Sequence, residues 1–181
     1  MKTWLVSDTH FGHKNIVKVK NRDGKPLRPF ATIEEHDTAL IANWNMLVSP
    51  DDRVFHLGDV SLCSRDHFHV VMHQLYGRKI LIKGNHDILK LQDYALHFED
   101  SRSSHEIGDV LLAHIPIAEA SLAPRWRGQI HGHLHSYHVG DPRYVNVSAE
   151  QTDFAPLLLE EALARFPKEQ RQYVLSQENP G

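Results

Sequence analysis

Five short polar clusters in this sequence contain residue types that bind metal ions in enzymes. In chain order they are Asp8-x-His10, Gly58-Asp59, Gly84-Asn85-His86-Asp87, His114 and Gly132-His133-x-His135. Carboxylates, imidazoles and an amide oxygen, without a thiolate, suit Mn, Fe, Ni, Co or Zn ions with five or six ligands. Each cluster alone is a weak signal, but the ordered set predicts a metal centre.

The same residues favour a centre with two metal ions. Two ions about 3.5–4 Å apart need a ligand that contacts both of them, and a carboxylate bridges readily. Gly58 allows the backbone to bring Asp59 close to the ions, so Asp59 is the candidate bridge. The charges of two divalent ions exceed those of Asp8, Asp59 and a bridging hydroxide together, so the centre would attract an anionic phosphoryl group.

The hydrophobic pattern places these clusters at the ends of strands. It predicts strands over residues 2–7, 53–57 and 79–83, and a polar cluster begins where each of them ends. Further strands are predicted over 102–107, 109–114, 127–131 and 143–148, with a hairpin turn at Gly108-Asp109. Sites in open α/β sheets form beyond the carboxyl ends of the strands, which is where the clusters fall.

Three helices are predicted between and after these strands. The first covers 32–48, begins at a capping box and carries an apolar stripe that includes Leu47. The others cover 64–76 and 156–166. Because a βαβ-type first half precedes a hairpin-rich second half, the pattern predicts an α/β fold with a mixed sheet.

The composition fits one compact domain over residues 1–181. Hydrophobic residues make up 41% of the chain and charged residues 24%, which excludes a disordered or low-complexity chain. The net charge of −3 is too balanced for coating nucleic acid or membrane, whereas histidine, with 15 residues, is abundant. The single cysteine, Cys63, excludes an internal disulfide, and no signal peptide or membrane span is evident. We therefore expect a cytoplasmic protein, with a frayed polar tail over 168–181.

The ordered clusters resemble the calcineurin-like metallophosphoesterase superfamily, whose pattern is DxH, GD, GNH(D/E), H and GHxH. The match runs from Asp8 to His135 and includes every element of the pattern in order. The resemblance implies a β-sandwich of two mixed sheets flanked by helices. It also implies one metal site formed by Asp8, His10, Asp59 and His135, and a second formed by Asp59, Asn85, His114 and His133.

The resemblance implies a reaction as well. His86 would lie near the scissile phosphate, where it stabilises charge and protonates the leaving oxygen. A hydroxide that bridges two metal ions would hydrolyse a phosphoester, with Mn expected and Fe, Zn, Ni or Co as alternatives. A phosphodiester is favoured over a monoester, because no capping domain is present to enclose a small monoester. The segment SDTHFGHKNI looks like that of small bacterial and phage phosphoesterases, whereas GDVSLC departs from the GDxVDRG string of protein phosphatases.

Other functions of the same fold remain open in the sequence. A phosphomonoesterase or a nuclease would share the ligands, and a nuclease would also need a basic track. A non-catalytic scaffold, such as the retromer subunit of this fold, lacks the catalytic histidine, so His86 favours an enzyme. We expect the partner to be a phosphorylated small molecule or a nucleotide, without a membrane and with nucleic acid less favoured. The sequence does not predict the oligomeric state.

A basic segment over residues 14–28 is the candidate for substrate contacts. It carries six basic residues and one acidic residue, a net charge of +5, directly after the first metal cluster. Gly24 and Pro26 predict a loop there instead of one long helix. The predicted substrate-binding residues in and beside this segment are His13, Asn15, Arg22 and Arg28.

Supporting roles are expected for several other polar residues. Asp87 would either orient a neighbouring histidine or cap a helix that follows it. His56 and His131 are expected to be structural, because His56 lies within a strand and His131 alternates with His133 along another. His69 and His73 are spaced to chelate a metal on one helix face, but a solvated face is the expected interpretation.

Overall fold

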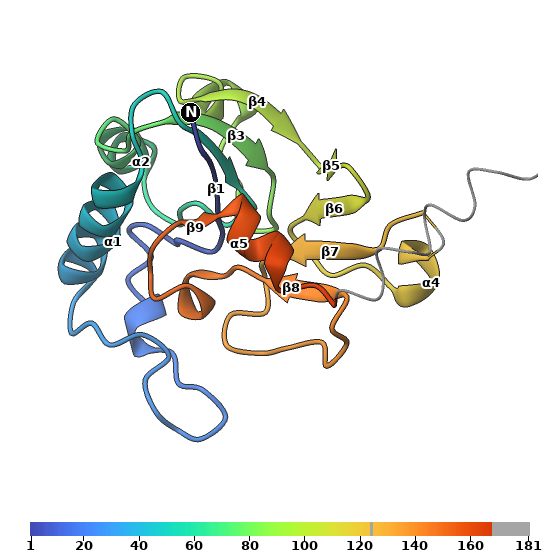
Figure 1. Ribbon diagram of the computed structural model, residues 1–181. Helices are drawn as coiled ribbons and strands as arrows, with labels where there is room; N and C mark the ends of the chain where they lie inside the picture. The colour runs from blue at the N-terminus through green and yellow to red at the C-terminus, as the bar shows by residue number, and fades with distance from the viewer. Residues whose placement is uncertain (124, 168–181) are drawn as a thin grey trace, which may run out of the picture.

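The computed structural model describes residues 1–123 and 125–167, which form two sheets with helices outside them (Figure 1). The predicted polar tail over 168–181 lies outside the described residues. The strand order is β4-β3-β2-β1-β9 in the larger sheet and β5-β6-β7-β8 in the smaller one. Both sheets are mixed, so the predicted α/β fold of two mixed sheets flanked by helices is confirmed.

The larger sheet aligns the ends of four parallel strands. Its strands are β1 (Thr3–Val6), β2 (Arg53–His56), β3 (Arg78–Ile82), β4 (Phe98–Arg102) and β9 (Leu157–Leu158). Strands β1 to β4 run parallel, and β9 pairs antiparallel with β1. Because Val6 lies opposite His56, and His56 opposite Leu81, the loops that follow β1, β2 and β3 leave the sheet side by side.

The smaller sheet combines a hairpin with parallel strands. Its strands are β5 (Ser104–Ile107), β6 (Val110–Ala113), β7 (Gly128–His131) and β8 (Tyr144–Asn146). Strands β5 and β6 pair antiparallel around the predicted turn at Gly108 and Asp109, whereas β6, β7 and β8 are parallel. The carboxyl ends of β6 and β7 therefore also share an edge.

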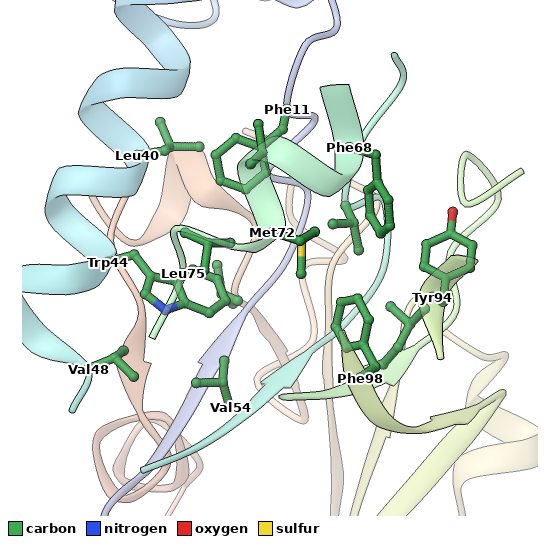
Figure 2. Packing of buried hydrophobic residues seen from close by; sticks show 14 of the residues in the cluster. Phe11, Leu40, Trp44, Val48, Val54, Phe68, Met72, Leu75, Tyr94 and Phe98 are labelled. Carbon is green, nitrogen blue, oxygen red and sulfur yellow. The ribbon is translucent and has the colours of Figure 1, made fainter. Parts of the chain in front are cut away.

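Alternation along the strands divides the core into two layers. Trp4 and Val6 of β1 face α1 (Ile33–Leu47) and α2 (Arg65–Met72), and Figure 2 shows Trp44 and Phe68 of these helices packed over the larger sheet. Leu5 lies on the opposite face, among buried residues of the smaller sheet. The remaining helices are short: η1 (Ile16–Lys18), α3 (Leu91–Tyr94), α4 (Glu119–Leu122), η2 (Ala149–Gln151) and α5 (Leu159–Ala164). No helix in the described part of the chain is long and apolar enough to cross a membrane.

Several elements differ from the prediction, and α2, expected over 64–76, ends at Met72. Strand β4 was not predicted, and the strand expected over 102–107 is divided between β4 and β5. Only Phe98 of β4 is fully buried, and the other residues of this edge strand are polar. The strand therefore has no hydrophobic pattern from which it could be predicted. The helix expected over 156–166 begins at Leu159, since the two preceding residues pair with β1. Leu47 is 37% exposed and so does not belong to the buried stripe of α1.

The amino ends of the strands are held together by one carboxylate. Asp52 accepts hydrogen bonds from Lys2 N (2.6 Å), Trp4 Nε1 (3.0 Å) and Ser49 N (3.1 Å). These hydrogen bonds lower the pKa of Asp52 to about 2, because they stabilise its charged form. This aspartate therefore fixes the entry into β1 and β2.

Candidate metal centre

The polar clusters converge where strands of both sheets end. Asp8 and His10 follow β1, Asp59 follows β2, and Asn85 follows β3. His114 follows β6, and His133 and His135 follow β7. Hydrogen bonds from Asp8 N to Gly58 O (2.9 Å) and from Gly132 N to His114 O (3.0 Å) join neighbouring loops within each sheet. His133 N donates to Asp8 Oδ2 (2.9 Å) and joins the two sheets.

Two groups of side chains are close enough to hold one metal ion each. The first contains Asp8, His10 and His135, and the second contains Asp59, His114 and His133. Within each group the candidate ligand atoms all lie within 4.8 Å of one another. These are two candidate metal-binding groups, and they contain six of the seven residues that the sequence predicts as ligands.

Asp59 lies between the two groups. Its Oδ2 atom is 3.6 Å from His10 Nε2 in the first group and 3.4 Å from His114 Nε2 in its own group. The seventh predicted ligand, Asn85, lies beside the second group, with its Oδ1 atom 3.0 Å from His114 Nε2. The arrangement brings the residues of the predicted ligand sets together, with one carboxylate near histidines of both groups.

The backbone at the centre is strained. Asp8, His10, Asp59, His133 and His135 have positive φ angles between 50° and 67°, where few residues other than glycine are found. Such conformations cost about 1–3 kcal/mol each and persist only when the surrounding structure holds them. Five of these unfavourable backbone conformations occur at candidate ligands, so the fold places these side chains at an energetic cost.

Buried polar atoms and close backbone contacts fit metal ions in these groups. Asp8 Oδ1 and both ring nitrogens of His10 are buried without a hydrogen-bond partner in the described structure. A Cβ atom at Gly132 would overlap Asp8 Oδ2, and one at Gly84 would overlap Asp59 Oδ1. The backbone therefore closes around the carboxylates and leaves unpaired oxygen and nitrogen atoms inside, as expected of ligands for cations.

Burial shifts the pKa values of Asp8 and His10 in the first group, whereas Glu150 and Asp8 raise the pKa of His135 against burial. Burial raises the pKa of Asp8 and lowers the pKa of His10 well below its ordinary value, in both cases because water cannot solvate the charge. Burial also acts to raise the pKa of Asp59, but the hydrogen bond and charge of His114 lower it below its ordinary range. Buried carboxylates beside a neutral imidazole favour cations, which would balance the negative charge.

Asp87 supports the bridging position through the backbone. Its carboxylate accepts hydrogen bonds from Asp59 N (2.9 Å), Val60 N (2.9 Å) and Gly84 N (2.7 Å). The sequence predicts that Asp87 either orients a histidine or caps a following helix. The observed hydrogen bonds instead join the loop after β2 to the loop after β3. Asp87 thus lies one layer behind the candidate ligands and holds the backbone of Asp59.

Glu150 is a supporting residue that the sequence analysis missed. Its Oε1 atom accepts hydrogen bonds from His135 Nδ1 (3.0 Å) and Arg28 Nε (2.8 Å). Burial opposes ionisation of Glu150, but His135 and Arg28 lower its pKa below its ordinary value. A carboxylate bound to Nδ1 fixes the tautomer of His135, so Nε2 faces Asp8 Oδ1 at 3.8 Å with its lone pair free.

Arg28 is buried behind the first group. Its three guanidinium nitrogens are bonded within the protein, to Asp8 O (2.6 Å), Thr9 O (3.0 Å), His36 Nε2 (2.7 Å) and Glu150. Its side chain is fully buried. This buried position favours a role in holding the Asp8 loop. It does not favour the contact with substrate that the charge pattern predicts for Arg28.

The other predicted substrate-binding residues lie nearer to solvent. The ring of His13 is 5.3 Å from that of His10 and 6.5 Å from that of His86, between centroids. Asn15 is exposed beside His13, and exposed Arg22 stacks 4.4 Å from the ring centre of Tyr137. The basic segment over residues 14–28 contains only the short helix η1 and a tight turn, in agreement with the loop predicted from Gly24 and Pro26.

His86 lies at the open side of the centre. Its backbone N–H donates to Asp59 Oδ1 (2.8 Å), and its half-buried ring is 5.5 Å from that of His10. Two grooves begin nearby. One, of about 790 Å³, is lined by His13, Lys14, Asn15 and the apolar side chains of Ile33, Ile41 and Val70. The other, of about 630 Å³, is lined by Asn85, His114, Lys83, Ser103, Ser104 and Trp126.

The two histidines predicted to be structural lie outside the candidate ligand set. His56 is buried and bonded to Thr9 Oγ1 (2.9 Å), and His131 is buried with its Nδ1 2.7 Å from Gly132 O, as predicted. The expected solvated face at His69 and His73 is wrong for His69, which is half-buried and bonded to His97 (2.8 Å). His97 is distant in sequence, so the local pattern contained no sign of this contact.

Fold and site together define an α/β protein of two mixed sheets with paired candidate metal-binding groups at its strand ends. The uncharacterized protein MJ1445 of Methanocaldococcus jannaschii is 31% identical over 169 residues, which cover 88% of both chains. The chain belongs to one family with MJ1445. The Gene 66 protein of Mycobacterium phage L5 is 33% identical over 167 residues, covering 74% of this chain and 77% of the phage protein.

A solved structure has the same fold. The protein of unknown function AQ665 from Aquifex aeolicus superposes with a TM-score of 0.69 and 25% identity, over 90% of this chain and 98% of its own. No protein-family profile matches the chain. The relatives thus establish a family and a fold without a named activity.

Proposed function

We propose that this protein is a metal-dependent phosphoesterase of the calcineurin-like metallophosphoesterase superfamily. The observation that carries the proposal is Asp59, whose Oδ2 lies 3.6 Å and 3.4 Å from histidines of two separate candidate metal-binding groups. A shared carboxylate is what a pair of metal ions requires, and two such ions would activate a water molecule and stabilise both oxygens of the displacement. Together with Asp59, one proposed site contains Asp8, His10 and His135, and the other contains Asn85, His114 and His133.

The side chains around the centre have distinct proposed tasks. Asp87 and Arg28 hold the backbones of Asp59 and Asp8, so the ligands are in place before substrate arrives. His86 is proposed as the general acid. Its backbone bond to Asp59 fixes its distance from the centre, while its half-buried ring is accessible to the leaving oxygen.

The two grooves support a phosphodiester as the substrate. One begins at His13, and the other is lined directly by Asn85 and His114. A diester has an organic group on each side of the phosphorus, and each group would occupy one groove. A monoester would leave one of them empty. The apolar wall of the first groove and Trp126 in the second favour organic groups with apolar or aromatic surfaces.

The test is hydrolysis by the metal-free chain after addition of Mn²⁺, with an aryl phosphodiester and the matching aryl monoester compared. We expect activity that requires metal, is abolished by chelator and favours the diester. His86→Ala should retain its metal and lower kcat about 10²–10⁴-fold, with a smaller loss for better leaving groups.

His138→Ala, at an exposed histidine outside the centre, is the matched control and should leave kcat unchanged. Full activity after exhaustive chelation would contradict the proposal. So would failure of the Mn²⁺-loaded chain to hydrolyse either ester.

A further inference from the structure

Three histidines meet where α2 lies against the turn between α3 and β4. His69 is in the last turn of α2, His73 caps that helix, and His97 immediately precedes β4. His69 Nδ1 is 2.8 Å from His97 Nε2, and the ring centres of His73 and His97 are 4.8 Å apart. We refer to these three residues as the histidine cluster. None of them belongs to the candidate metal centre.

A carboxylate lies behind the cluster. His69 Nε2 is buried without a hydrogen-bond partner in the described structure, and Asp93 Oδ1 is 3.8 Å away. Arg65 Nε holds the same oxygen at 2.5 Å. A carboxylate beside Nε2 favours the proton on that nitrogen, which leaves the lone pair of Nδ1 directed towards His97.

The spacing of one pair, His69 and His97, is close to that of two imidazoles bound to one ion. Nitrogens of two histidines on a tetrahedral zinc are about 3.3 Å apart, given Zn–N distances of about 2.0–2.1 Å. The observed 2.8 Å between His69 and His97 would need to widen by about half an ångström. His73 is exposed and follows His69 by four residues, so its ring is free to turn towards the same point.

The cluster offers imidazole nitrogens from α2 and from the turn before β4. Neutral imidazoles without thiolate suit Zn²⁺, Cu²⁺ or Ni²⁺.

We propose that the histidine cluster binds one divalent transition-metal ion, with His69, His73 and His97 as ligands. Asp93 orients His69, and water completes the coordination. Such an ion joins the end of α2 to the start of β4 and stabilises the fold. The site shares no ligand with the candidate metal centre, so the inference does not depend on the proposed phosphoesterase activity.

The test is a titration of the metal-free chain with Zn²⁺ by calorimetry, in a background that carries Asp8→Asn and Asp59→Asn. We expect one Zn²⁺ per chain in this background and a higher melting temperature with Zn²⁺. His73→Gln and His97→Gln should each weaken binding at least about tenfold, whereas His138→Gln should not. Co²⁺ bound in place of Zn²⁺ should show the visible absorption of a tetrahedral site.

The proposal is overturned if the background binds no Zn²⁺ up to about 1 mM, a bound on affinity of about 4 kcal/mol. It is also overturned if His73→Gln and His97→Gln leave affinity unchanged. Should the background not fold, the unmodified chain provides the same test, because His73→Gln must then lower its Zn²⁺ content by one ion. His73 is exposed, so this substitution does not threaten the fold.

Discussion

Asp52 and Asp8 are buried aspartates at opposite ends of the same parallel strands, and their surroundings are opposite too. Asp52, at the amino ends, accepts three hydrogen bonds, and its pKa falls to about 2. Asp8, at the carboxyl ends, has one buried oxygen without a partner, and burial raises its pKa. The carboxylate at one end of the sheet is fully hydrogen-bonded, whereas the carboxylate at the other end has one oxygen without a hydrogen-bond partner in the described structure.

The backbone is also unusual at the carboxyl ends of the strands. At the carboxyl ends, Asp8 and Asp59 both have a φ of 56°, an unfavourable conformation for residues with a side chain. Gly132 and Gly84 lie against these carboxylates, where a Cβ atom would overlap an oxygen. Functional sites commonly retain such local costs, which the rest of the fold offsets. Substitutions at the two ends should therefore affect different measurements.

The largest effect is expected from Asp8→Asn. It removes a negative ligand, so metal affinity should fall more than about 100-fold, beyond the loss typical of outer partners, and hydrolysis should fall with it. The metal-free protein should unfold at the same or a higher temperature. Asparagine removes the buried charge, tolerates a positive φ and can still accept the bond from His133 N.

Elemental analysis and melting of the metal-free proteins check this prediction. Unchanged metal content in Asp8→Asn would show that Asp8 is not a ligand. A clearly lower melting temperature without metal would show that Asp8 stabilises the fold, and the contrast with Asp52 would then disappear.

A smaller effect is expected from Glu150→Gln. Loss of the carboxylate that orients His135 should weaken one metal ion about 10–100-fold, because outer partners of ligating histidines have effects of this size. The ion at Asp59, His114 and His133 should be retained. A two-step metal titration would therefore show one weakened and one normal step.

Glu160→Gln provides the control, since Glu160 is an exposed residue of α5. Equal weakening of both steps would indicate general damage to the fold and would remove the orienting role from Glu150.

The smallest effect is expected from Asp52→Asn, and it should appear in stability alone. Its folded pKa of about 2 lies below the ordinary value, so the stabilisation is complete above about pH 4 and is lost as the pH falls towards 2. The melting temperature of Asp52→Asn should be lower than that of the unmodified chain at pH 7. The difference should shrink between pH 4 and pH 2, while metal content is unchanged.

Asp51→Asn, at the exposed neighbouring residue, should show no difference at any pH. Other titrating groups affect the melting temperatures of Asp52→Asn and the unmodified chain equally. Their effects therefore cancel in the difference between the two melting temperatures. A constant difference from pH 7 to pH 2 would mean that the charge of Asp52 does not carry its stabilising effect.

The sequence by itself determined the strands that end in polar clusters and the residue types in those clusters. Periodicity of apolar residues is a local property, and it predicted β1, β2 and β3 within one or two residues. The capping box that begins α1 was also readable, and Thr32 Oγ1 accepts the Glu35 N–H (3.1 Å) as predicted. Because strand ends meet at one edge of a sheet, these local features also predicted which side chains converge.

Tertiary structure alone decided which residues support the candidate ligands and which distant histidines meet. Arg28 and Glu150 are separated by 122 positions, and His69 and His97 by 28, so no local pattern connects the members of either pair. Polar residues such as those of β4 carry no periodic signal either. Their roles follow from the folded chain, because burial removes water and leaves each charged group dependent on the partner that the fold supplies.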